Sequence, residues 1–131
     1  MSNTIVSVDQ LSQAIATELE SYNRAILDEI KEETKKHMDR LVRETKDTAP
    51  VGKRRKHYKD SITSRKEFET VMGAEYIWYV KGPDYRLSHL LENGHALRNG
   101  GRTQGTHFIR IASESVIESY IHAVEEVCRN G

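Results

Sequence analysis

The stretch that decides the fold is YRLSHLLENGHALRNGGRTQGTHF at residues 85–108, together with APVGK at residues 49–53. Leucines dominate the first part of the longer stretch, and Gly94 then supplies the left-handed conformation in which many helices end. The pattern therefore predicts a short helical turn over residues 87–93. The polar, glycine-rich connection that follows is typical of an exposed loop, and we expect it to be either disordered or ordered by a partner.

Residues 9–47 are predicted to form one long helix. Their apolar positions recur mostly three or four apart, and no Gly or Pro interrupts the segment. The helix should end at Ala49-Pro50, because the residue before a proline is pushed out of the α region. Its length would be about 58 Å, more than a domain of this size is wide, so part of it should project. The segment at 31–37 is poor in apolar residues, which allows either a break or a solvated section there.

Three strands are expected after this helix, at residues 59–65, 67–72 and 75–81, with a hairpin turn at Gly73-Ala74. The third strand is apolar on both of its faces, which is typical of a strand that is covered on both sides.

A second helix is expected at residues 109–128, with an apolar face broad enough for two neighbours, the sheet and the first helix or another subunit. We therefore predict a single α+β domain over residues 1–131. It consists of the long N-terminal helix, a small antiparallel sheet of three or four strands at 59–81, the turn and loop at 82–107, and a C-terminal helix packed on the sheet.

The charges of the 131-residue chain cancel overall but are segregated along it. Residues 1–48 carry −3, residues 49–110 carry +6 and residues 111–131 carry −3. A head-to-tail oligomer could place the basic and acidic parts against each other. Chance clustering on solvated faces is the other interpretation.

Cys128 is the only cysteine, so an internal disulfide is excluded, in agreement with assembly in a reducing cytoplasm. It lies on the apolar pattern of the last helix, and we expect it to be packed. No apolar run approaches the roughly 20 residues of a membrane span, and no signal peptide is evident, so no membrane partner is expected.

Four side chains invite comparison with a zinc site, because imidazoles and carboxylates bind this metal. They are His89, Glu92, His95 and His107. Gly94 should interrupt any helix that would align them, so we expect no metal there and predict that Glu92 makes loop or subunit contacts.

A basic run could attract phosphate through charge alone. It comprises Lys53, Arg54, Arg55, Lys56, His57 and Lys59. Such runs are more often solvated loops or protein contacts, and the aromatic residues at 76–79 are more often core than a surface for stacked bases. No serine or cysteine has a histidine and a carboxylate placed around it by the sequence. We therefore expect no catalytic residue, no cofactor and no enzymatic activity.

Several short motifs occur in an order that resembles a family of bacteriophage neck and tail-component proteins, built around the tenth gene product of a lambda-like coliphage. The motifs are Ala49-Pro50 with Gly52, Tyr58 to Ile62, His89-Leu90-Leu91-Glu92-Asn93-Gly94-His95, and His107-Phe108. The order and spacing cover about residues 30–115.

The resemblance implies a structural virion protein that joins head to tail, or completes the tail, as a ring of copies around the DNA passage. Its partners would be other copies of itself and neighbouring connector and tail proteins, with non-specific DNA contact in the channel. It would be located in the virion and assembled in the host bacterial cytoplasm. The alternative is a small non-enzymatic nucleic-acid-binding module that uses the basic central segment. A metal-dependent hydrolase built on the histidine cluster ranks below both.

Overall fold

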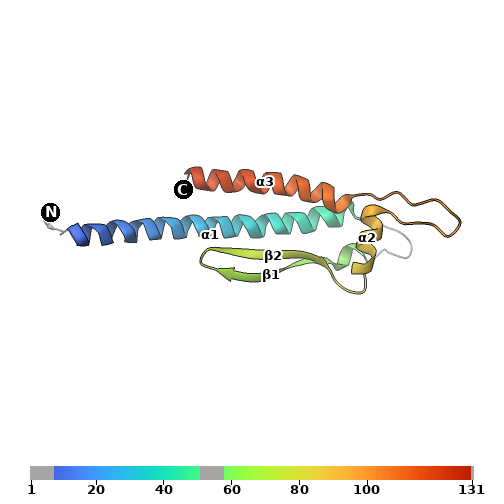
Figure 1. The fold of residues 1–131 in the computed structure, drawn as a ribbon, viewed down its shortest axis with the longest axis horizontal. Coiled ribbons are helices and arrows are strands. Elements are labelled where there is room, and N and C mark those ends of the chain that lie inside the picture. The colour runs from blue at the N-terminus through green and yellow to red at the C-terminus, as the bar shows by residue number, and fades with distance from the viewer. Residues whose placement is uncertain (1–7, 51–57, 131) are drawn as a thin grey trace.

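The computed structural model describes residues 8–50 and 58–130 and shows an elongated molecule in three layers (Figure 1). The middle layer is the helix α1 (Val8–Thr48). A hairpin of β1 (Ile62–Thr70) and β2 (Gly73–Val80) covers one side of it, and α3 (Phe108–Asn130) covers the other. The short turn η1 (Lys59–Ser61) and the helix α2 (Tyr85–Asn93) lie at the end where the layers meet. The α+β class is confirmed.

α1 is continuous over 41 residues, so the break that we allowed for at residues 31–37 is wrong. The polar run consists largely of good helix formers. It also contains favourable pairs one turn apart, such as Lys35 with Asp39, whose charged atoms lie 3.1 Å apart. The helix ends at Thr48 as the proline predicts, and the Ala49 amide donates to the Thr45 carbonyl at 2.9 Å.

The N-terminal part of α1 projects, as its length predicts. Every residue from 10 to 25 is exposed, whereas buried and half-buried positions recur from residue 26 onward. Figure 1 shows the reason, because both α3 and the hairpin stop alongside the middle of α1.

The hairpin has two strands rather than three or four. Residues 59–61 form a 3-10 turn, and the two strands expected at 59–65 and 67–72 are one strand that contains a bulge between Lys66 and Phe68. The bulge shifts the alternation, so Phe68 lies on the face away from α1 and is 53% exposed. The turn is at Val71-Met72, two residues before the predicted position.

Only one face of β2 is covered by another element. On that face the Trp78 indole N–H donates to Thr45 Oγ1 of α1 at 2.9 Å. On the other face the Arg65 guanidinium lies 5.2 Å from the centre of the Tyr79 ring. We expected a second layer on this face; the Tyr79 ring is instead covered by the Arg65 side chain, through a cation–π contact.

α3 packs on α1 and not on the sheet, so this part of the predicted architecture is wrong. A two-stranded sheet presents one buried face, and α1 occupies it. The contact between the two helices includes polar pairs, among them Thr34 Oγ1 and Tyr120 Oη at 2.6 Å.

The core is small, as the polar composition predicts, and it lies at the end where all the elements converge. Its buried members are Ala49, Tyr58, Ile62, Val80, Leu91 and Phe108. The Tyr58 and Phe108 rings meet edge to face with centroids 6.1 Å apart. These residues include parts of the motifs at 49–50, 58–62 and 107–108, which are therefore packing motifs.

Candidate functional site

Glu92 connects α2 to α3. Its carboxylate oxygens accept hydrogen bonds from the main-chain amides of Ile109 and Arg110 at 2.8 and 2.9 Å. These amides belong to the first turn of α3, where N–H groups have no partner within the helix and where negative charge is favourable. We expected loop or subunit contacts for Glu92; in the structure its side chain caps the first turn of α3.

Two glycines allow the backbone segments around this cap to touch. Gly94 has a φ of 78°, and a Cβ there would lie 2.2 Å from the Thr103 carbonyl oxygen. A Cβ on Gly105 would lie 2.3 Å from the Glu92 carbonyl oxygen. Both positions therefore require glycine. We call the Glu92 cap and these two glycines the clasp.

The histidines make separate local contacts. His89 Nδ1 lies 3.0 Å from the side-chain nitrogen Nδ2 of Asn93, and His95 Nδ1 lies 3.0 Å from Thr103 Oγ1. His107 stands at the start of α3 with a φ of 53°. Among the residues that the structure describes, no group of three or more His, Cys, Asp or Glu side chains is arranged to hold a metal ion.

Residues 95–104 form a two-stranded arm that extends beyond the core (Figure 1). Ala96 and Arg102 form a β-bridge, and the Leu97 amide donates to the Gly101 carbonyl at 3.0 Å. Every side chain from residue 96 to 102 is exposed. The arm begins and ends at the clasp, so its base has a fixed position relative to α3.

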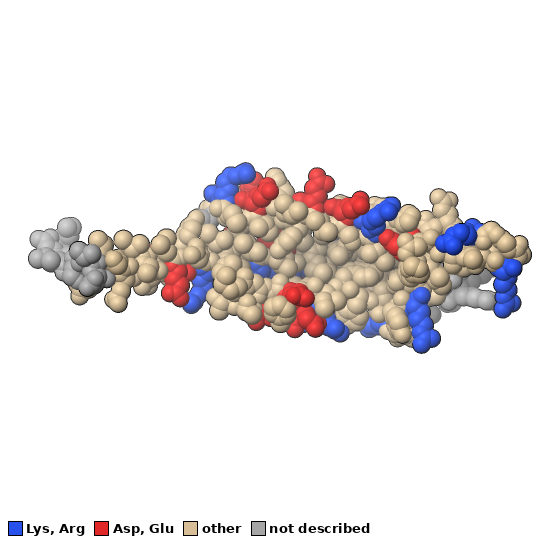
Figure 2. Space-filling model, in the orientation of Figure 1, with Lys and Arg blue, Asp and Glu red and all other residues tan. Residues whose placement is uncertain are grey.

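The end of the molecule that carries the arm is basic. Lys and Arg gather there in Figure 2, and the exposed cations of this end are Lys81, Arg86, Arg98, Arg102 and Arg110. None of them makes an ion pair within residues 8–50 and 58–130.

Residues 81–110 contain five Lys or Arg and only two acids, so this segment is basic, and both acids make local hydrogen bonds. Asp84 accepts a hydrogen bond from the Ser61 hydroxyl at 2.6 Å, and Glu92 caps α3. The basic residues that we singled out at 53–57, together with Gly52, lie outside the described residues.

α3 carries a second charged surface, of opposite sign, on the side turned away from α1. Glu114, Glu118 and Glu125 are exposed and make no ion pair within the described parts of the chain. Beside them Ile117 and Ile121 are 55% and 52% exposed. We call these five residues the outer face of α3.

Cys128 is exposed, so the prediction that it is packed is wrong. The broad apolar pattern of α3 divides between two sides. Ala112 and Val116 are buried toward α1, whereas Ile121 points outward with Cys128 about two turns further along the helix. Ile117 lies between these two sides and borders a cavity against α1.

The projecting half of α1 carries an apolar stripe, which is the third surface feature. Its members are Leu11, Ile15, Leu19 and Tyr22, with exposed fractions of 52, 52, 56 and 49%. Helical spacing continues the stripe into Ile26 and Ile30, which are half-buried where α3 begins to cover α1. The stripe is thus a continuation of the surface on which α3 packs.

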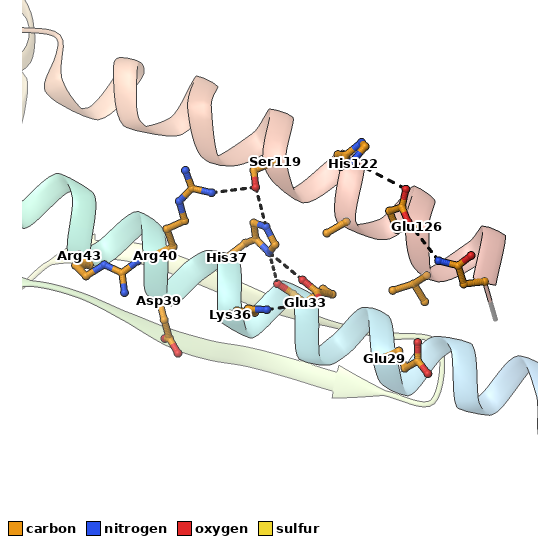
Figure 3. A pocket seen from close by; sticks show the side chains of 13 residues that line it. Glu29, Glu33, Lys36, His37, Asp39, Arg40, Arg43, Ser119, His122 and Glu126 are labelled. Carbon is orange, nitrogen blue, oxygen red and sulfur yellow. Dashed lines mark hydrogen bonds and ion pairs between the residues drawn. The ribbon is translucent and has the colours of Figure 1, made fainter.

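Between α1 and α3 runs a groove of about 710 Å³ whose floor is a chain of hydrogen bonds (Figure 3). His37 Nδ1 lies 2.8 Å from the Glu33 main-chain oxygen, which can only accept, so Nδ1 carries the proton. The other ring nitrogen, Nε2, then accepts from the Ser119 hydroxyl at 3.2 Å, and Ser119 Oγ accepts from Arg40 Nη1 at 2.9 Å.

This chain brings together a serine, a histidine and, 3.4 Å from the imidazole, the Glu33 carboxylate. The sequence does not reveal this cluster, because Ser119 and His37 are 82 residues apart and lie on different helices. Ser119 lies in the middle of α3, where main-chain N–H groups are used in the helix and cannot form an oxyanion hole around its hydroxyl. The arrangement is suited to fixing the register of α3 on α1.

The model of the family described as "Bacteriophage HK97-gp10, putative tail-component" matches residues 13–94, well over half of the chain, so the chain belongs to this family. Membership makes it a structural component of the phage particle. The match includes Ile15, Leu19 and Tyr22 of the α1 stripe, the hairpin, and Glu92 and Gly94 of the clasp.

No curated protein matches the chain, and no solved structure matches it. Within the described residues, no helix is long and apolar enough to cross a membrane.

Proposed function

We propose that the protein is a subunit of the head–tail connector or tail-completion region and acts by assembling into a ring around the DNA passage. The observation that carries the proposal is the stripe of Leu11, Ile15, Leu19 and Tyr22. α3 ends at Asn130, which lines the same groove as Glu29, and so does not reach the stripe.

Burial of the stripe would stabilise an assembly. Complete burial of a large apolar side chain is worth about 1.5–3 kcal/mol, and each of these four residues is about half exposed. Each therefore has on the order of 1 kcal/mol to gain from a partner, and the four are aligned so that one neighbour can cover them all. Isolated exposed leucines are ordinary, but an aligned set on a projecting helix is typical of a binding surface.

A closed ring also requires two different surfaces on each subunit, because neighbours in a ring meet head to tail. The basic end and the outer face of α3 supply surfaces of opposite charge in separate places. Electrostatic complementarity of this kind orients subunits as they associate.

The basic end favours one further contact, with DNA phosphates in the channel. Cations that meet phosphates without reading base edges give binding that lacks sequence preference. This contact would be secondary, because the opposite charges elsewhere on the molecule reduce the attraction of the whole protein for a polyanion. A module whose main task is nucleic-acid binding is the alternative function.

Deleting the gene from the phage or prophage that encodes it tests the proposal. We expect heads and tails that fail to form complete, infectious particles, with restoration by the wild-type gene. The double variant Ile15→Glu with Leu19→Glu should fail to restore them.

The matched control for this variant is Gln13→Glu, which adds charge to the opposite side of the same exposed helix and should restore particles. Normal particle yield without the gene would exclude the proposed role.

A further inference from the structure

We propose that the arm of one copy docks on the outer face of α3 of the next copy. The inference rests on the proposed assembly into a ring and identifies the two surfaces that meet.

The charges of the two surfaces are complementary and make no ion pair within the described chain, although the Arg86 guanidinium lies 5.8 Å from the centre of the Tyr85 ring. The arm side presents Arg98 and Arg102 on the arm, with Arg86 nearby on α2. The outer face of α3 presents Glu114, Glu118 and Glu125. Three arginines thus stand available for three carboxylates, and arginine forms especially well-defined pairs with this group.

Both surfaces also present apolar side chains among the charges. Leu97 on the arm is 42% exposed and Tyr85 on α2 is 55% exposed. Ile117 and Ile121 lie between the glutamates of α3 in the helical sequence and are similarly exposed. An apolar centre surrounded by charged pairs is the usual composition of a specific protein interface.

The two surfaces cannot meet within one chain. The clasp holds the base of the arm at the N-terminal end of α3, and the arm extends away from the core in the direction opposite to the helix (Figure 1). The outer face of α3 in turn points away from α1. A neighbour placed alongside can therefore receive the arm, which gives the head-to-tail contact that a ring needs.

The clasp favours this contact further by fixing the direction of the arm before binding. Gly94 and Gly105 allow two backbone segments to lie in direct contact, so the base of the arm is held by main-chain atoms as well as by the Glu92 cap. A preorganised arm loses less conformational freedom when it docks.

Exchange of charge between the surfaces tests the proposal. The first variant carries Arg98→Glu and Arg102→Glu, the second carries Glu118→Arg and Glu125→Arg, and the third combines all four. Each gene is returned to the phage or prophage that lacks its own copy, and infectious particles are counted. We expect the first two variants to lower the yield about 10- to 100-fold and the combined variant to restore most of it.

Two measurements keep the outcome interpretable. Thermal unfolding of each purified variant checks that it folds, and Arg43→Glu serves as the control, because it reverses an exposed cation on α1 away from both surfaces. Titration of labelled duplex DNA with wild type and the first variant tests the other partner for a basic arm.

The proposal is overturned if the folded arm variant supports normal yield, or if the combined variant remains as defective as its parents. It is also overturned if the arm variant loses DNA binding while the α3 variant keeps full yield, since the arm would then be a DNA contact. In each of these cases the need for the gene itself still decides the proposed function separately.

Discussion

Removal of the Glu92 carboxylate should destabilise the protein by releasing the start of α3. In the intact protein this carboxylate accepts from the Ile109 and Arg110 amides at 2.8 and 2.9 Å. Alanine at position 92 leaves both amides without their acceptor, while the leucines of α2 and the core keep their own contacts. The loss should therefore be confined to the clasp and to α3.

The size of the effect follows from the geometry. Loss of a helix cap costs about 0.5–2 kcal/mol, and a hydrogen bond to a charged group contributes about 1.5–3 kcal/mol when it is well sheltered. Glu92 is half-buried and makes two such bonds, so we expect Glu92→Ala to lower the free energy of unfolding by about 2 kcal/mol. For a chain of this length that corresponds to a fall in Tm of roughly 6–10 °C.

Urea denaturation followed by circular dichroism measures the change. Glu92→Gln should lose less than Glu92→Ala, because its amide oxygen still accepts one bond. Glu114→Ala is the matched control, an exposed glutamate of α3 whose loss should change stability by less than about 0.5 kcal/mol. A Glu92→Ala protein as stable as this control would refute the assignment of the cap.

Three further predictions concern pH, nucleic acid and metal. Burial raises the pKa of the Tyr58 phenol above its ordinary value of 10.0, so its contribution to stability is complete below that pH and is lost as pH rises toward the folded-state value. Urea denaturation above pH 10 should therefore show a smaller loss for Tyr58→Phe than for wild type, and equal losses would contradict the burial argument. Binding of duplex DNA should be weak, indifferent to sequence and reduced by salt; tight sequence-dependent binding at physiological salt would instead support the nucleic-acid-binding module. Protein purified without a metal-affinity tag should contain well under one zinc per chain by elemental analysis, and stoichiometric zinc that disappears when His89 and His95 are replaced would show that a site exists.

The helices could be predicted from the sequence because their signals are local. Apolar spacing located α1, and proline fixed its end to within one residue. Gly94 likewise predicts the end of α2, because a backbone with positive φ favours glycine at that one position and needs no information from distant residues. For Glu92 the sequence predicted only loop or subunit contacts, because its partners at residues 109 and 110 lie on another helix.

The remaining features depend on contacts between distant segments. The bulge after Lys66 inserts one extra residue into β1 and so interrupts the alternation of apolar and polar side chains. A short turn between two strands would interrupt it in the same way, so the sequence predicts two strands where there is one. The apolar pattern of α3 indicates a broad apolar face but does not indicate which element packs against it. The prediction that Cys128 is packed is wrong for this reason. No local pattern could pair Ser119 with His37, since each residue is unremarkable in its own helix.

Assembly as a ring is the central proposal, and electron cryo-microscopy of the joint between head and tail tests it directly. In particles of the phage or prophage that encodes the chain, we predict a closed ring of copies related by rotation about the particle axis. The α1 stripe should be covered by other subunits, and the arm should lie on a neighbouring α3. Absence of the protein from the joint, or copies that leave the stripe in water and touch only through small polar contacts, would contradict the account.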